Sequence, residues 1–124
     1  MNSSPHEDAF GQLLDRLYFG ALDQRDKGNK FERLMRSYLM TDPAWASQFS
    51  HVWLWSEYPD RNGRTDIGVD LVAEEATGAR VAIQCKFYDP EHVVSKKDID
   101  SFIAASSSEE FSRRLWVSTS LREW

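Results

Sequence analysis

Apolar residues recur at three- and four-residue spacing in the first third of the chain. From residue 10 to residue 21 they fall on one helix face, and the run 4–7 can cap the start of that helix. Gly28-Asn29 interrupts the pattern, which then resumes from Phe31 to Leu39. We therefore predict two amphipathic helices, the second ending at Asp42-Pro43 because a residue before proline disfavours helical geometry.

After His51 the pattern changes to short runs of branched and aromatic residues, which are typical of strands. The loop between the second and third runs contains Gly78, which can adopt the left-handed conformation that a three-residue hairpin loop needs. We therefore predict a hairpin closed by residues 76–78. The predicted strands are 52–55, 67–74, 80–88 and 114–118.

A further helix is predicted between the third and fourth strands. Ser95 and Asp98 can cap its start, and it should continue to about Ser107. Its buried side should consist of Ile99, Phe102 and Ile103. An order of two helices, three strands, a helix and a strand favours an α/β fold, with a mixed central sheet flanked by helices.

Composition limits the class of protein. The 124 residues are enough for one domain, and a hydrophobic fraction of 41% is enough for a core. The net charge of −5 argues against binding nucleic acid by bulk electrostatics alone. With no long apolar run and a single cysteine, Cys85, we expect a cytoplasmic protein without disulfides.

Polar residues converge on the predicted hairpin. Side chains alternate along a strand, so Gln84 and Lys86 share one face while Cys85 faces the core. A loop of residues 76–78 places Asp70 opposite Gln84, with their β-carbons about 5 Å apart. Val69 and Leu71 should both point into the apolar layer on the other side. The sequence thus predicts a carboxylate, an amide and an ammonium group on one face.

Together with Glu32, this set resembles the PD-(D/E)XK nuclease superfamily and most closely its Mrr-like restriction endonuclease branch. The matching segments cover about residues 28 to 120 and include Lys30-Phe31-Glu32, Asp66–Leu71 and Ile83-Gln84-Cys85-Lys86. The resemblance implies a restriction-endonuclease-like three-layer fold, with residues 1–124 as a single Mrr-like nuclease domain.

The resemblance also implies a place in a larger protein, because Mrr-like domains are found at the N-terminus of type ISP restriction enzymes and of helicases. This chain stops just after its last predicted strand, at residues 121–124. We therefore expect it to be the N-terminal fragment of a larger motor or restriction polypeptide.

The resemblance also implies a Mg²⁺ or Mn²⁺ site. Asp70 would be the main ligand, joined by the amide oxygen of Gln84 and the backbone carbonyl of Cys85, since Mg²⁺ prefers oxygen ligands. The wider superfamily has an acidic residue where this chain has Gln84, and Glu32 could restore the missing charge through a metal-bound water. Lys86 would stabilise developing charge or orient the attacking water.

Structural alternatives remain open for each of these residues. Asp70 and Lys86 could form an ordinary cross-strand ion pair, and Glu32 could be the polar border of a buried stripe. Asp66 could be an auxiliary carboxylate, but roughly 13 Å of extended chain would separate it from Asp70 unless Gly68 bends the strand. A turn or capping role for Asp66 is the simpler interpretation.

DNA contacts are predicted at two places. Arg61 and Arg64 precede the first motif strand, while Lys96 and Lys97 start the late helix, where phosphate binding is favourable. Tyr88 continues the face of Gln84 and could border the substrate groove. All five could equally be packing residues or solubilising charges.

These observations predict a metal-dependent endodeoxyribonuclease domain of an ATP-dependent restriction enzyme or helicase. One site cuts one strand, so double-strand cleavage would require dimerisation or two encounters. The alternative is a catalytically inactive nuclease-fold module that binds DNA or another partner, which the acidic net charge and Gln84 would favour.

Overall fold

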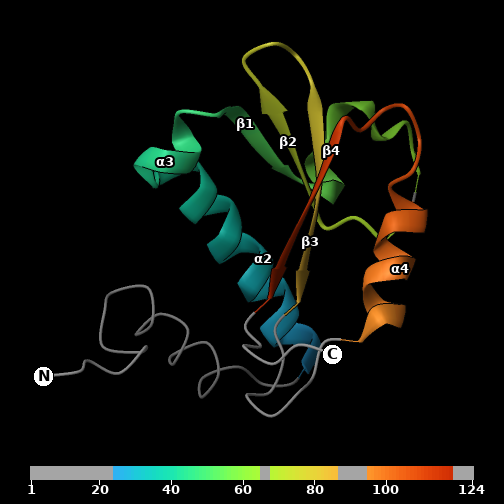
Figure 1. The fold of residues 1–124 in the computed structure, drawn as a ribbon. Helices are drawn as coiled ribbons and strands as arrows, with labels where there is room; N and C mark the ends of the chain where they lie inside the picture. The colour runs from blue at the N-terminus through green and yellow to red at the C-terminus, as the bar shows by residue number, and fades with distance from the viewer. Residues whose placement is uncertain (1–23, 65–67, 87–94, 119–124) are drawn as a thin grey trace, which may run out of the picture.

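The described part of the protein is a four-stranded sheet between helices (Figure 1). The structure is a computed structural model that describes residues 24–64, 68–86 and 95–118. The helix predicted over residues 10–21 lies outside them. In chain order the elements are α2 (Gln24–Thr41), α3 (Pro43–Ala46), β1 (Phe49–Leu54), the 3₁₀ helices η1 (Trp55–Glu57) and η2 (Pro59–Arg61), β2 (Leu71–Glu75), β3 (Arg80–Lys86), α4 (Lys96–Ala105) and β4 (Arg113–Ser118).

The sheet is mixed, as the sequence predicts. Its order is β1-β2-β3-β4; the first three strands are antiparallel neighbours, and β4 runs parallel to β3. A parallel pair needs a crossover connection, which here contains α4. The hairpin register is also confirmed, because Leu71 pairs with Ile83 and Glu74 with Arg80. Gly78 has a φ of 89°, the left-handed conformation expected of it.

Among the described elements, α2 covers one face of the sheet and α4 covers the other, which gives three layers (Figure 1). On one face, the α2 residues Phe31, Met35 and Leu39 are buried in a cluster that includes Leu71 and Ile83. On the other face, Phe102 of α4 is buried in a second cluster, whose other members are Trp55, Tyr58, Val69, Val72, Ala82 and Phe111. The three-layer α/β prediction is therefore confirmed.

The predicted break at Gly28-Asn29 is wrong, because α2 runs through both residues. A glycine inside a helix costs only about 1 kcal/mol relative to alanine. The buried stripe of Phe31, Met35 and Leu39 anchors the helix beyond that point and outweighs this cost. Asp42 ends α2 as predicted but also caps α3, with its side chain accepting from the Ala44 and Trp45 amides.

Predictions for the other elements are mostly confirmed, with shifted ends. Ser95 and Asp98 form the predicted capping box of α4. Ile103 is 46% exposed rather than buried, because the next position on a helix is turned about 100° from Phe102. The first strand begins at Phe49 and ends before Trp55, and β2 begins only at Leu71. No described helix has the length and apolarity needed to cross a bilayer.

Candidate active site

Asp70 lies where the pairing of β2 with β3 ends. Its backbone N–H donates to the Ile83 carbonyl at 2.9 Å, while its own carbonyl accepts from the Trp55 N–H at 2.9 Å. In a regular antiparallel strand, both backbone groups of one residue point to the same neighbour. Asp70 instead bonds β3 on one side and the end of β1 on the other. Since Leu71 also pairs with Ile83, two residues oppose one, which is the arrangement of a β-bulge.

This bulge changes which side chains share a face. Leu71 belongs to the α2-side cluster, whereas Val69 packs in the α4-side cluster, so the expectation that both point the same way is wrong. The direct cross-strand pair of Asp70 and Gln84 is also not formed, because the ladder ends one step earlier. Gln84 alternates with Ile83 and so extends on the α4 side, like Ala82.

The Asp70 carboxylate is held against the backbone of β3. Its Oδ2 accepts a hydrogen bond from the Cys85 N–H at 2.8 Å. Gly68 precedes it with a φ of 87°, and a Cβ there would lie 3.2 Å from that of Ala105, so glycine suits both the turn and the close approach of α4. The sheet and α4 therefore fix the chain on either side of this carboxylate.

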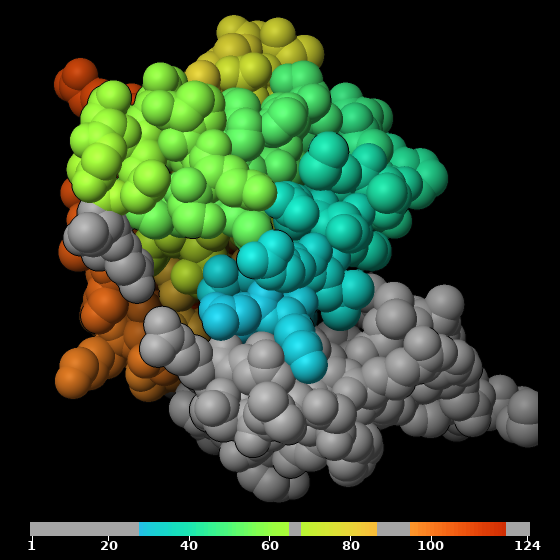
Figure 2. Space-filling model, turned by 180° about the vertical axis from the view of Figure 1, so that it is seen from behind, coloured from blue at the N-terminus to red at the C-terminus, as the bar shows by residue number. Residues whose placement is uncertain are grey.

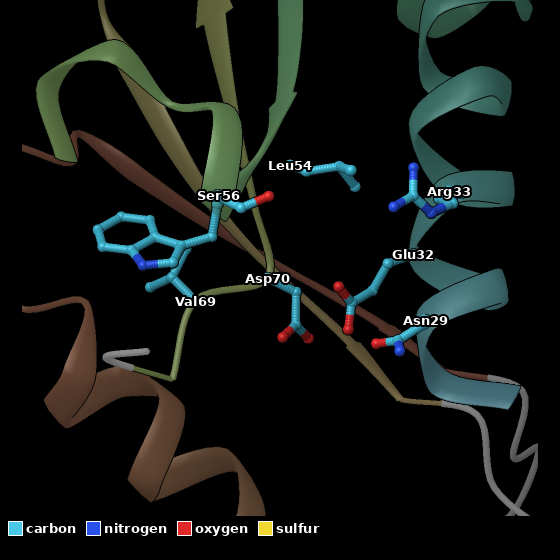
Figure 3. Close-up of a pocket in the computed structure, with 8 residues that line it drawn as sticks. Asn29, Glu32, Arg33, Leu54, Ser56, Val69 and Asp70 are labelled. Atoms are coloured by element: carbon cyan, nitrogen blue, oxygen red, sulfur yellow. The ribbon is translucent and has the colours of Figure 1, made fainter. Parts of the chain in front are cut away.

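Asp70 and Glu32 face one pocket of about 500 Å³ (Figure 3). Glu32 projects from α2 toward Asp70, which lies at the end of β2. Figure 2 shows the surface hollowed between α2 and the η1–η2 segment, with atoms of the β2–β3 region at the floor. The lining residues are Asn29, Glu32, Arg33, Leu54, Trp55, Ser56, Val69 and Asp70.

The pKa of the Cys85 thiol is affected by burial and by the negative charges of Asp70 and Glu32. It is 6% exposed and packs in the α2-side cluster, as predicted for a structural cysteine. Burial raises the pKa of the thiol well above its usual value, and the carboxylates of Asp70 and Glu32 raise it further. Two acidic groups thus converge beside the Cys85 backbone.

Gln84 carries a buried oxygen to which no residue of the described part of the chain donates. The residue is 6% exposed, and its Oε1 accepts no hydrogen bond there. Trp116, its register neighbour on β4, likewise has a buried Nε1–H without an acceptor. An unsatisfied buried polar group costs about 1–3 kcal/mol. A donor or a cation that bound the amide oxygen of Gln84 would therefore remove this cost.

Lys86 ends β3 two residues beyond Gln84 and is half-buried. No ion pair joins it to any residue of the described ranges, so the alternative of an Asp70–Lys86 ion pair is not seen there. In the parallel register, Lys86 lies beside Ser118 at the end of β4. Lys86 therefore lies at the same end of the sheet as Asp70, because β2 and β3 are antiparallel.

The oxygen donors present suit a hard divalent cation. Two carboxylates share the pocket, and carboxylate oxygens are ligands that Mg²⁺ prefers. Gln84 does not line this pocket: its side chain extends on the α4 side of β3, next to Cys85, whose amide holds Asp70. Within residues 24–64, 68–86 and 95–118, no three His, Cys, Asp or Glu side chains gather as a metal cluster. A metal held here would therefore need amide, backbone or water oxygens beside the carboxylates.

Two of the cations predicted to contact DNA, Arg61 and Arg64, already bond to other parts of the protein. Arg64 forms a bidentate pair with Glu110, at 3.0 Å for both bonds, and its guanidinium lies 5.2 Å from the centre of the Trp55 ring. Arg61 donates to the Arg64 carbonyl at 3.3 Å. These contacts support the structural alternative for Arg64.

The remaining predicted contacts lie on or near α4. Lys96 pairs with Asp100 at 2.6 Å, and Lys97 is exposed. Tyr88 lies outside the described residues.

Three polar residues of the pocket were not predicted from the sequence: Asn29, Arg33 and Ser56. Asn29 lies three positions before the predicted Glu32 and four before Arg33, so it neighbours both on the helix surface. That spacing could have identified Asn29 and Arg33 if the helix had been extended through Gly28. Ser56 lies in η1, and no sequence signal distinguishes it.

Comparisons with known proteins agree with this geometry. A family model described as a restriction endonuclease, Mrr_cat_2, matches residues 40–124. A solved structure described as an "ATP-dependent Type ISP restriction-modification enzyme LlaBIII bound to DNA" is 38% identical, with a TM-score of 0.70 over 90% of this chain. The match spans 7% of that much longer chain. No curated protein matches. The chain belongs to the Mrr_cat_2 family of restriction endonuclease domains.

Proposed function

We propose that this chain is the nuclease module of an ATP-dependent restriction enzyme or helicase, and that it hydrolyses DNA phosphodiester bonds with Mg²⁺ or Mn²⁺. One observation carries the proposal: the bulge at Asp70 presents a carboxylate, fixed by the Cys85 N–H, to a pocket shared with Glu32. Family membership supports the nuclease chemistry, and the long DNA-bound relative supports a larger polypeptide.

Asp70, the Gln84 amide oxygen and the Cys85 carbonyl would hold the metal ion, with Glu32 acting through a water. Bound there, the ion would supply a Lewis acid for the phosphate and an acidified water. The donor set supports this role, because carboxylate and amide oxygens are ligands that Mg²⁺ accepts while keeping several waters. Gln84 supplies one negative charge fewer than an acidic residue would.

The protein's own groups perform the positioning. The Cys85 N–H fixes the orientation of the Asp70 carboxylate, so little reorganisation is needed when substrate binds. Lys86, at the same end of the sheet, would donate hydrogen bonds to a phosphate oxygen or to the attacking water. Substrate would enter through the open hollow seen in Figure 2.

Cleavage of both strands would need two copies of the module or two encounters with DNA, since one site acts on one strand. Lys96, Lys97, Arg61 and Tyr88 remain proposed substrate contacts. We assign Arg64 a smaller part, because Glu110 already occupies its guanidinium fork.

The first test replaces Asp70 by Asn in the full-length protein that carries this chain. Cleavage should fall by at least about 10²–10³-fold, the range for losing one group that stabilises transition-state charge. Asn retains an oxygen for the Cys85 N–H, so the melting temperature should change little. The matched control is Asp60→Asn, an exposed carboxylate outside the pocket, which should cut normally. Unchanged cleavage by Asp70→Asn would overturn the assignment.

A second candidate is an inactive module on the same fold that binds DNA or another partner. It is favoured by Gln84, which stands where the wider superfamily usually has an acid, and by a pocket with only two carboxylates among its described residues. Calorimetric titration with Mn²⁺ separates the two candidates. Binding that disappears in Asp70→Asn supports the nuclease, whereas identical traces for both proteins support the inactive module.

A further inference from the structure

Arg33 is a cation of the Asp70 pocket. It lies one position after Glu32 on α2, is exposed, and lines the same pocket as Asp70. In Figure 3 its guanidinium projects from the helix toward the pocket rather than away from it. The pocket therefore combines two carboxylates, Asp70 and Glu32, with one guanidinium, that of Arg33.

Arg33 differs from most arginines of the described ranges because it has no protein partner there. It makes no hydrogen bond and no ion pair with any residue in those ranges. The arginines that are paired with carboxylates are Arg36 with Glu57, Arg64 with Glu110, Arg80 with Glu74 and Asp60, and Arg113 with Glu75. Within the described ranges, Arg33 is therefore unusual, because it shares a pocket with two carboxylates and pairs with neither.

Helix geometry explains why Glu32 does not neutralise it. Consecutive helix residues point in directions about 100° apart and do not face each other. The guanidinium thus remains available for a ligand entering from solvent. Its planar fork of donors matches the oxygens of a phosphate, which it can bind through two parallel hydrogen bonds.

A DNA strand approaching Asp70 and Glu32 brings more negative charge to a place that is already negative. A fixed cation at the side of the pocket would offset that repulsion and set the position of the backbone. Phosphate contacts of this kind fix the register of a nucleic acid without reading its sequence.

We propose that Arg33 binds a backbone phosphate of the DNA strand at the mouth of the Asp70 pocket. This inference rests on the proposed nuclease function. It adds a substrate-positioning residue next to the Lys30-Phe31-Glu32 segment, on the helix that also carries Glu32.

The test measures DNA binding by the full-length protein with Asp70→Asn, which prevents cutting, in EDTA. A short fluorescent duplex is titrated at 50 and 200 mM salt, with and without Arg33→Gln. Losing one phosphate contact reduces the slope of log K against log salt by about 0.9. The affinity ratio between the two proteins should therefore shrink by about 3.5-fold over this range. Arg113→Gln, the same charge change at the start of β4, should leave the slope unaltered.

An unchanged slope in a folded Arg33→Gln protein would overturn the inference, as would a slope change equal to that of Arg113→Gln. Melting temperatures of all variants establish folding. A second measurement uses proteins with Asp70 intact: Arg33→Gln should raise KM more than it lowers kcat, and Arg33→Lys should recover part of the loss. If wild-type protein binds DNA but never cuts it, while Arg33→Gln still reduces the slope, the nuclease assignment fails and the phosphate contact stands.

Discussion

Two clusters of ionisable groups in this protein are built in opposite ways. The charge network, which consists of Tyr58, Arg64, Arg80 and Glu110, joins the η1–η2 segment to the loop before β4, and opposite charges meet within it. The Asp70 pocket instead brings two carboxylates together, beside an Arg33 that pairs with neither of them. Ion pairs between opposite charges stabilise a fold, whereas convergent like charges are typical of functional sites.

Most polar groups of the charge network have partners, although Arg80 Nη1 is buried without a hydrogen bond and has only an ion pair with Asp60 at 3.1 Å. Tyr58 Oη donates to Glu110 at 2.6 Å, and Arg64 binds both oxygens of the same carboxylate. These bonds, the one from Arg64 most of all, hold the pKa of Glu110 below its usual value. Arg80 lies over the rings of Trp53 and Tyr58, 5.0 and 5.3 Å from their centres. Because Arg64 and Arg80 already contact carboxylates and aromatic rings, they have few donors left for a DNA phosphate.

The pocket shows the reverse. Asp70 and Glu32 raise the pKa of the neighbouring Cys85 thiol, and Arg33 lacks a carboxylate partner in the described ranges. On β3, outside the pocket lining, Gln84 keeps a buried oxygen to which no described residue donates. The buried Gln84 oxygen costs stability in the protein alone, and a bound cation would relieve the repulsion between the two carboxylates.

Replacing Gln84 by Met should change stability and activity in opposite directions, with a larger effect on activity than the substitutions that follow. A Met of similar volume removes the orphaned oxygen, so the free energy of unfolding should rise by about 1 kcal/mol. Cleavage should nevertheless fall by about 10–100-fold, the usual effect of weakening a metal site. Urea denaturation and cleavage assays check the two halves.

The matched control for this substitution is Gln48→Met at an exposed position outside the pocket, which should alter neither quantity. If Gln84→Met destabilises the fold and leaves cutting intact, Gln84 is a structural residue. The orphaned Gln84 oxygen would then no longer support a functional site near Asp70.

Substitution of Glu110 by Gln should have a smaller and opposite effect. The bidentate bond to Arg64 weakens, so the unfolding free energy at pH 7 should fall by about 1–2 kcal/mol, while cleavage stays within about twofold. Glu109→Gln, at an exposed neighbouring position, is the control.

The pH dependence follows from the lowered pKa of Glu110. A depressed folded pKa contributes stability above the usual value of 4.5, and this contribution is lost as the pH falls through the folded pKa. The difference in unfolding free energy between wild type and Glu110→Gln should therefore shrink below pH 4.5. A difference that stays constant down to pH 2 would contradict the assigned role.

Local signals were sufficient to predict the layers and the hairpin register. The three-residue loop ending at Gly78 sets the pairing of Leu71 with Ile83, and the Ser95–Asp98 capping box sets the start of α4. Both depend on residues close in the chain, whose hydrogen bonds are encoded locally.

The bulge at Asp70 depends on distant partners and could not be predicted in this way. Its carbonyl bonds to Trp55, and the preceding Gly68 packs against Ala105 of α4. The pocket location of Arg33 was missed for a related reason. Gly28 suggests a helix end by propensity, but packing of the buried α2 stripe carries the helix through it.

The smallest effect concerns the titration of Tyr58. Burial, with a further contribution from the Glu110 hydrogen bond, raises the pKa of its hydroxyl to about 12 from 10.0. A raised pKa contributes stability that is complete below pH 10 and lost as the pH rises toward 12. Ultraviolet absorbance of wild type minus Tyr58→Phe isolates this residue. Glu110→Gln should move the midpoint to lower pH, because it removes a negative charge that opposes ionisation. Asp70→Asn should leave the midpoint in place, since the two clusters titrate independently; a shared shift would show that they are coupled.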